Sequence, residues 1–267
     1  MSTSAGSLLR SLLGAHVRRL GGSIAAADLV TLLGAAGCSE SGVRTALSRL
    51  KTRGTLLADR GRYRLSPAAL RDLERGDRRI YGYHPMAADD PWMVVLFSVP
   101  ESDRPVRHRL RTELTRLGCG AVAPGSWVGP GHLADEAVEV LTEQDLIGYV
   151  TVFRTARPVV AADRAAGWWD LDGLARRHRA FLDAMGPVDR RWADGGGTVE
   201  QAFVDHLHLV DAWRELPYLD PGLPEPLLPP GWPGRDGVAL FARLNRRLEP
   251  QAREHARAVV GGGGARE

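Results

Sequence analysis

The chain has 267 residues, 44% of them hydrophobic, which is enough for a substantial core and for two or three domains. Its two cysteines, Cys38 and Cys119, are too few for a disulfide framework or a zinc site, so a reduced, cytoplasmic setting is expected. No apolar run approaches the about 20 residues that cross a bilayer, and Arg10 interrupts the first apolar stretch, so neither a membrane span nor a signal peptide is expected.

Charge is distributed unevenly along the chain. Residues 1–80 contain 14 Lys and Arg against 6 Asp and Glu, a net charge of +8, whereas the remaining residues contain 21 against 26, a net charge of −5. A cationic N-terminal third on a mildly acidic body points to a polyanionic partner for that third, most simply nucleic acid.

The N-terminal elements come in a regular order. Ser7 is expected to cap a first helix that ends by Gly21, and residues 26–36 predict a second. The apolar spacing of Val43, Ala46, Leu47 and Leu50 then predicts a third helix, because these positions share one helical face. Another helix follows from Pro67 and is expected to end at Gly76.

The third helix carries a distinctive outward face. Hydroxyl side chains lie opposite its apolar stripe and cations flank them, an arrangement suited to a DNA major groove, because small groups permit close approach and Arg can bind guanine. The alternative is an ordinary solvated helix face. Two short strands around Arg60 and Gly61 follow, and a basic hairpin after such a helix is typical of a winged helix-turn-helix. The predicted DNA-binding residues are Ser41, Arg44, Thr45, Ser48, Arg49, Lys51, Arg60 and Arg62.

The rest of the chain predicts a linker, an α+β domain and a mostly helical domain. A polar linker is expected over residues 81–91. Strand, helix, strand, helix and strand over residues 92–160 predict a ferredoxin-like α+β domain, with Asp103 near the start of its first helix. Residues 165–260 predict a mostly helical domain that includes helices over 171–185, 198–216 and 237–258. The proline-rich stretch 217–234 predicts irregular structure, and residues 261–267 predict a disordered tail.

Four stretches carry a family resemblance: GVRTALSRL at 42–50 with GRYRLS at 61–66; VPESDRPVRHRLRTELTRLGCGAVAPGSWVGP at 99–130; WDLDGLARRHRAFL at 169–182; and WRELPYLDPGLPEPLLPPGWPG at 213–234. The chain resembles the PaaX family of bacterial transcriptional regulators over nearly its full length. The resemblance implies an α+β protein with a winged helix-turn-helix over 1–80, a central domain similar to ferredoxin-like CRISPR-associated nucleases, and a helical C-terminal domain. It also implies a homodimeric repressor of double-stranded operator DNA, released by an acyl-CoA such as phenylacetyl-CoA.

An acyl-CoA effector needs cations for its phosphates and an apolar pocket for its acyl group. The residues expected to supply them are Trp127, Trp168, Trp169, Arg176, Arg177, Trp213 and Arg214. The alternative for each tryptophan is a role as a core or domain-interface anchor.

The competing functional class is a metal-dependent nuclease built on the central domain, for which Glu101 and Asp103 are the nearest carboxylates to the end of its first strand. A protein-binding adaptor is a third reading, against which the charge of residues 1–80 argues. Asp205, His206, His208 and Asp211 resemble a ligand cluster, but positions two apart on a helix diverge. No catalytic residue, metal site or cofactor is therefore expected.

Overall fold

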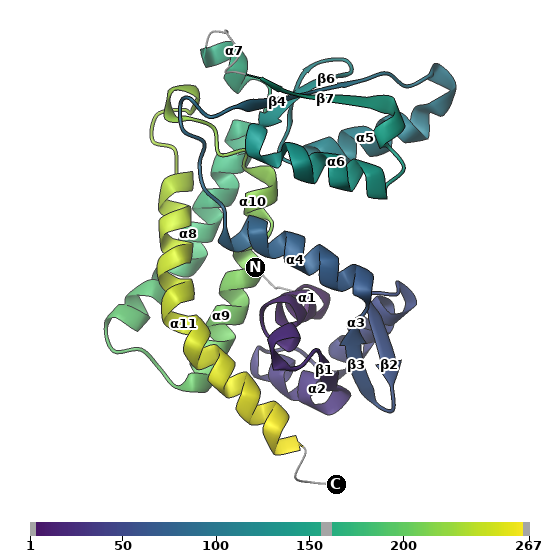
Figure 1. The fold of residues 1–267 in the computed structure, drawn as a ribbon. Coiled ribbons are helices and arrows are strands. Elements are labelled where there is room, and N and C mark those ends of the chain that lie inside the picture. Colours follow the sequence, from purple (N-terminus) through teal and green to yellow (C-terminus); the bar gives the residue numbers. More distant parts are fainter. Residues whose placement is uncertain (1–3, 156–161, 264–267) are drawn as a thin grey trace. The chain divides into compact units, whose positions relative to one another are not determined.

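The computed structural model describes residues 4–155 and 162–263, and the chain divides into two compact units (Figure 1). The first unit comprises Met1–Gly82, Ala180–Arg214 and Asp236–Glu267, and the second comprises Tyr83–Arg179 and Glu215–Arg235. The helical C-terminal part of the chain thus contributes to both units. The three-domain division expected from the sequence remains a prediction.

The N-terminal part of the first unit is a winged helix-turn-helix, as predicted. Its elements are α1 (Ala5–Ala15), a 3-10 turn η1 (Val17–Leu20), β1 (Ser23–Ala25), α2 (Ala26–Ala35), α3 (Glu40–Thr52), β2 (Leu56–Asp59), β3 (Arg62–Leu65) and α4 (Pro67–Tyr81). The three strands form an antiparallel sheet in the order β1-β3-β2. The hairpin β2–β3 follows α3 directly and is the wing (Figure 1).

Two expected boundaries in this region are wrong. The cap of α1 is Ser4, whose side chain accepts the backbone N–H of Ser7, so the helix begins earlier than predicted. Gly76 does not end α4, which continues to Tyr81 and includes the start of the expected linker region. Arg75, Gly76 and Arg79 are buried in α4, and tertiary packing there overrides the weak helix propensity of glycine. Residues 83–91 contain no helix or strand.

The first unit is completed by α9 (Val199–Trp213) and by most of α8 (Leu171–Ala193) and α11 (Gly234–Gly263). Phe203 and Leu207 of α9, together with Ala252 and Ala256 of α11, belong to the same buried cluster as the core of the winged helix. The winged helix therefore shares its core with the C-terminal helices.

Two of the three predicted C-terminal helices, α8 and α11, are longer than predicted, whereas α9 ends at Trp213, before the predicted Leu216. The helix α8 runs past Pro187 to Ala193, because its last turn is anchored by Trp192, whose indole N–H donates to Asp205 at 2.7 Å. The helix α11 runs past Pro250 to Gly263, so residues 261–263 of the expected tail are helical. The remaining tail residues, 264–267, lie outside the described residues.

The central part of the second unit is a four-stranded antiparallel sheet with two main helices, as expected for a ferredoxin-like domain. Its elements are β4 (Trp92–Phe97), η2 (Glu101–Asp103), α5 (Arg104–Arg116), β5 (Gly120–Ala123), β6 (Ser126–Pro130), η3 (Gly131–Leu133), α6 (Ala134–Glu143), η4 (Ile147–Tyr149) and β7 (Val150–Thr155). The strand order is β5-β6-β4-β7. The domain has one strand more than the three expected, because Pro124 and Gly125 form a turn that makes the second expected strand a hairpin of β5 and β6.

The two faces of this sheet have different neighbours. Met93 and Val95 of β4 pack with Leu114 of α5 and Ala137 of α6 on one face. Trp92, on the other face, joins a cluster with residues from the start of α8 and from the proline-rich segment. A short helix α7 (Ala162–Ala166) precedes α8.

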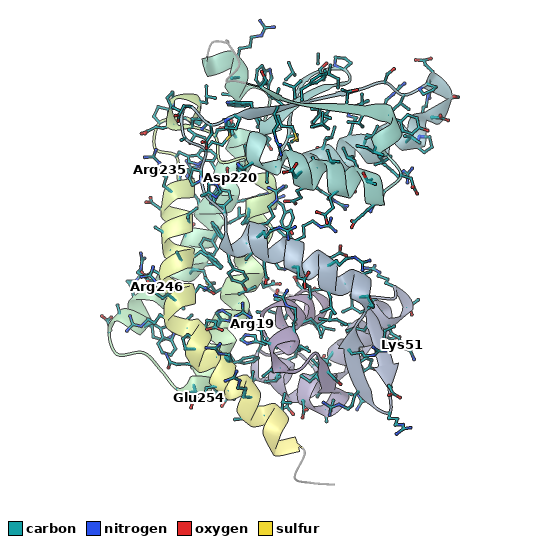
Figure 2. All side chains as sticks on the ribbon, viewed as in Figure 1. Arg19, Lys51, Asp220, Arg235, Arg246 and Glu254 are labelled. Atoms are coloured by element: carbon teal, nitrogen blue, oxygen red, sulfur yellow. The ribbon has the colours of Figure 1, made fainter. Side chains whose placement is uncertain are left out.

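The proline-rich segment is less irregular than predicted. It contains the short helix α10 (Leu216–Leu219) and the 3-10 turn η5 (Glu225–Leu227). A buried hydrogen bond of 2.8 Å joins His178 of α8 to Asp220, whose other carboxylate oxygen accepts the backbone N–H of Gly222. Asp220 thus fixes the turn after α10 against α8 (Figure 2). No helix within the described residues is long and apolar enough to span a membrane.

Candidate nucleic-acid interface and ligand cavity

The outward face of α3 is assembled as the sequence predicts. Val43, Ala46, Leu47 and Leu50 are buried, and their burial turns the opposite face toward solvent. All eight predicted DNA-binding residues are exposed: Ser41, Arg44, Thr45, Ser48, Arg49, Lys51, Arg60 and Arg62. The side chain of Lys51 can be followed near the end of α3 in Figure 2. The structure thereby places the set on one helix and the adjoining wing.

The hydroxyl groups on this face are held in fixed directions. Thr45 donates its hydroxyl to the carbonyl of Ser41 at 2.8 Å, and Thr52 donates to the carbonyl of Ser48 at 3.0 Å. These bonds leave the oxygen lone pairs outward as acceptors. Arg44 pairs with Glu40 one turn earlier through a bond of 2.8 Å, and both side chains are mostly exposed, so the pair is weak and easily exchanged for another anion.

A hollow of about 470 Å³ lies between the start of α1 and the face of α3. Ser41, Thr45 and Arg49 line it, and so do three residues absent from the predicted set, Ser4, Arg10 and Arg53. The contribution of Ser4 and Arg10 depends on how α1 packs against α3, which no local sequence pattern reports, whereas Arg53 follows Arg49 by one helical turn. Three guanidinium groups and several hydroxyls around one hollow are a suitable environment for an anion.

The wing has a strained tip. Arg60 and Gly61 are its two turn residues, and both have positive φ values, 45° and 77°. Such two-residue turns favour Asn or Gly in the first position, so an arginine there is unfavourable. Arg62 instead turns back to β1, where it donates to the hydroxyl and the carbonyl of Ser23 at 3.1 Å. Arg60 is an exposed cation at the tip of the wing, whereas Arg62 braces the hairpin.

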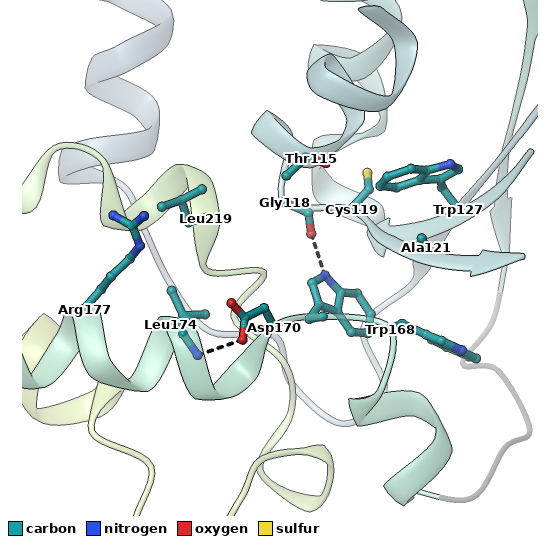
Figure 3. A pocket seen from close by; sticks show the side chains of 12 residues that line it. Thr115, Gly118, Cys119, Ala121, Trp127, Trp168, Asp170, Leu174, Arg177 and Leu219 are labelled. Carbon is teal, nitrogen blue, oxygen red and sulfur yellow. Dashed lines mark hydrogen bonds between the residues drawn. The ribbon is translucent and has the colours of Figure 1, made fainter. Parts of the chain in front are cut away.

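A second cavity, of about 320 Å³, lies within the second unit (Figure 3). Four of the predicted effector-binding residues line it: Trp127 from β6, Trp168 and Trp169 from the turn before α8, and Arg177 from α8. Thr115 and Cys119, at and beyond the end of α5, complete the wall on another side. Among the described residues, the guanidinium of Arg177 has no hydrogen-bonding or ion-pair partner, so it is available to a ligand.

Trp169 is held in place by the backbone of the central domain. Its indole N–H donates to the carbonyl of Gly118 at 3.0 Å, and its ring covers Gly120. The dashed line that ends at Gly118 in Figure 3 marks this hydrogen bond. A methyl group on Gly120 would lie 2.5 Å from the Cε2 atom of Trp169, which is closer than real carbon atoms approach. The wall of the cavity therefore requires glycine at position 120.

Replacing Gly120 by alanine is expected to displace Trp169 and to lower stability by about 1–3 kcal/mol, the usual cost of overpacking. The measurement is tryptophan emission together with urea unfolding. Gly148→Ala is the matched control, because nothing lies within 4 Å of a methyl group there. An unchanged emission spectrum and midpoint for Gly120→Ala would contradict this view of the cavity wall.

The other predicted effector-binding residues do not line this cavity. Arg176 is exposed on α8. Trp213 is buried in the first unit, where it stacks on Phe241 at a centroid distance of 4.9 Å and donates to the carbonyl of Ile80 at 3.2 Å. Arg214 bonds to Asp211 and to the hydroxyl of Ser7. These contacts favour the core-anchor reading for Trp213, and a ligand contact from the three residues stays a prediction.

The histidine and aspartate cluster of α9 holds the winged helix to the C-terminal helices. Buried His206 bonds to His16, the residue that follows α1, at 3.1 Å and to Asn245 of α11 at 3.0 Å. One carboxylate oxygen of Asp211 accepts hydrogen bonds from Ser7 and Ser11 of α1, at 2.7 and 2.8 Å. Within the described residues, no group of three or more His, Cys, Asp or Glu is arranged to hold a metal ion.

Burial makes this cluster sensitive to acid. Burial, together with neighbouring His206, lowers the pKa of His16 to about 3, and burial also lowers the pKa of His206. Because the folded pKa lies below the ordinary value of about 6.5, stability is fully present above pH 6.5 and is lost as the pH falls toward the folded pKa. We expect the free energy of unfolding at pH 5.0 to be about 2 kcal/mol lower than at pH 7.5 from His16 alone.

Urea unfolding at the two pH values measures this loss. Removing the titrating ring with His16→Gln should reduce the difference, whereas His108→Gln, on the exposed face of α5, should retain it. A difference that is equally large in His16→Gln would show that other groups cause it.

Comparisons with known proteins match the chain from end to end. Three family models cover successive segments: PaaX-like protein over residues 4–69, PaaX protein central Cas2-like domain over 85–166, and PaaX-like protein C-terminal domain over 169–258. The transcriptional repressor PaaX of Escherichia coli K12 is 30% identical over 258 residues, which cover 92% of this chain and 81% of that protein. The chain belongs to the PaaX family.

A solved structure supports the fold of this PaaX-family chain. The uncharacterized protein Rv0674 from Mycobacterium tuberculosis is 27% identical and aligns with a TM-score of 0.60, over 96% of this chain and 99% of that one. Membership of the PaaX family groups the chain with transcriptional repressors rather than with the nucleases that share the central fold.

Proposed function

We propose that this PaaX-family chain is a cytoplasmic homodimer that binds double-stranded operator DNA and is released from it by an acyl-CoA-type ligand such as phenylacetyl-CoA. The observation that carries the DNA-binding part is the outward face of α3, where hydroxyls and arginines stand exposed beside a cation-lined hollow. In this proposal α3 enters the major groove, and the hollow receives a backbone phosphate.

The wing supplies a second contact in the proposal. Arg60 extends from the strained tip and reaches the DNA backbone or the neighbouring minor groove, while Arg62 keeps the hairpin in place. Strain at an exposed turn persists where the residue serves another purpose, and phosphate binding is a purpose that arginine suits.

The cavity in the second unit is the proposed effector site. Three tryptophans offer flat apolar walls to an aromatic acyl group, and Arg177 supplies a cation at the same cavity. A volume of about 320 Å³ is in the range of small-molecule sites. The ligand favours an arrangement of the dimer that no longer fits the operator, and it can shift that equilibrium only by its differential affinity for the two states.

A gel shift tests the proposal directly. Purified protein is mixed with the DNA upstream of its own gene in the presence of random competitor DNA, and phenylacetyl-CoA or another acyl-CoA is then added. We expect a specific complex that the ligand dissociates, and we expect Trp168→Ala to keep the complex but to lose the response to the ligand. A complex no better than that with random DNA would contradict the repressor, and a complex indifferent to every acyl-CoA would contradict the effector.

A further inference from the structure

The helix α5 presents an exposed face that the function above does not use. Arg104, His108, Arg111 and Thr115 are separated by four, three and four residues, so they form one stripe along the helix. All four side chains are exposed, and no carboxylate lies within the stripe. The only acidic residue of α5, Glu113, lies off the stripe, where it pairs with Arg116 at 2.9 Å.

The C-terminal end of this stripe lies at the ligand cavity. Thr115 lines the cavity and is the last member of the stripe. At 1.5 Å of rise per residue, Arg111 lies about 6 Å along the helix from Thr115, His108 about 10 Å and Arg104 about 16 Å. Among residues 4–155 and 162–263, the guanidinium groups of Arg104 and Arg111 have no hydrogen-bonding or ion-pair partner, although the backbone carbonyl of Arg111 accepts the hydroxyl of Thr115 at 2.9 Å. A cationic track therefore leads out of a cavity with aromatic walls.

We propose that this stripe binds the phosphate groups of the effector, and that Arg111 makes the principal contact. The inference rests on the proposed function, because it concerns the same cavity. The ligand then has an apolar head among the tryptophans and a chain that leaves past Thr115, with its anionic part along Arg111, His108 and Arg104. Arginine is suited to this role, because its planar fork pairs with phosphate oxygens through two hydrogen bonds.

The charged residues at the two ends of the stripe indicate where along it the phosphates bind. Glu101 and Asp103 immediately precede the helix, near Arg104, and reduce the positive potential at that end. Arg177 lines the cavity from α8 and adds a cation at the other end of the track, where the carboxylate of Asp170, which accepts the backbone N–H of Gly173, also lines the cavity. The anionic groups are consequently placed between Arg177 and His108, and Arg104 contributes less than Arg111.

Calorimetric titration of the full-length protein with two probes tests this assignment. One probe is phenylacetyl-CoA, and the other is the phenylacetyl thioester of N-acetylcysteamine, which has the same head and no phosphate. We expect Arg104→Ala/Arg111→Ala to weaken binding of the CoA thioester at least tenfold and to leave binding of the short thioester unchanged. Arg109→Ala is the matched control, because it removes an exposed arginine from another side of the same helix.

Each outcome separates the two proposals. If the wild-type protein binds neither thioester, the proposed effector class is wrong, and the assignment of the stripe is wrong with it. If the double variant binds the CoA thioester as tightly as the wild type does, only the phosphate site is wrong. A double variant that binds operator DNA more weakly but both thioesters normally would show that the stripe serves DNA instead. If the double variant and Arg109→Ala lose equal affinity for the CoA thioester, the loss comes from the overall positive charge of the helix, and the assignment of the stripe is wrong.

Discussion

Replacing Arg49 by alanine is expected to lower operator affinity by about ten- to a hundredfold, the range for losing one specific arginine contact. Arg49 lies on the exposed face of α3 and lines the hollow between α1 and α3, so it is placed to reach either a base edge or the adjacent phosphate. Fluorescence anisotropy with labelled operator measures the affinity. If Arg49 binds phosphate, the slope of log K against log salt also falls by about one unit.

The effect should not come from unfolding, because the side chain of Arg49 is exposed. The thermal unfolding midpoint of the Arg49→Ala protein should match that of the wild type. Arg246→Ala is the matched control: this arginine is exposed on α11, away from the candidate interface, and should leave operator affinity unchanged (Figure 2). Wild-type affinity in a folded Arg49→Ala protein would remove α3 from the proposed interface.

Replacing Trp213 by alanine is expected to lower the free energy of unfolding of the first unit by about 3–5 kcal/mol. The indole is 1% exposed, lies 4.9 and 5.0 Å from the rings of Phe241 and Phe181, and donates a hydrogen bond to Ile80. The substitution leaves a large cavity and an unpaired carbonyl among α4, α8, α9 and α11. Urea unfolding followed by circular dichroism measures the loss.

The matched control is Trp168→Ala, because Trp168 is only partly buried and lines the ligand cavity. It should cost much less stability than Trp213→Ala and should instead abolish the response to the ligand. A stable Trp213→Ala protein that no longer responds to acyl-CoA would reverse the assignment and return Trp213 to the effector-binding residues.

The fold could be predicted from sequence wherever a local pattern and tertiary packing agree. The apolar spacing from Val43 to Leu50 defines α3, because this helix buries the face that its period marks. The expected ends at Gly76 and near Ala258 are wrong, because buried neighbours continue α4 through Gly76, and Val259 and Val260 of α11 pack against the core. Pro124 and Gly125 are a local turn signal, but the strand order expected from the sequence counts the residues on both sides of that turn as one strand.

The residues of the candidate sites also divide into those that a local sequence pattern predicts and those that tertiary packing brings in. The exposed residues of α3 follow from one helical period, so they could be predicted together. Arg10 could not, because it joins the hollow only when α1 packs beside α3, whereas Arg53, four residues after Arg49, follows the same helical period. The cavity is lined by Trp127 and Trp168, which come from distant parts of the sequence, and their residue type predicts a shared apolar pocket. The place of Thr115 in the cavity wall could not be predicted, because it depends on the position at which α5 ends.

The most direct test of the account is a DNase I footprint of the purified protein on the DNA upstream of its own gene. A homodimer that uses two copies of α3 should protect two half-sites, related by two-fold symmetry and separated by about one helical turn or a multiple of it. Phenylacetyl-CoA should abolish that protection. Protection of no defined site, at protein concentrations that coat random DNA equally, would contradict the central claim that this chain is a sequence-specific repressor.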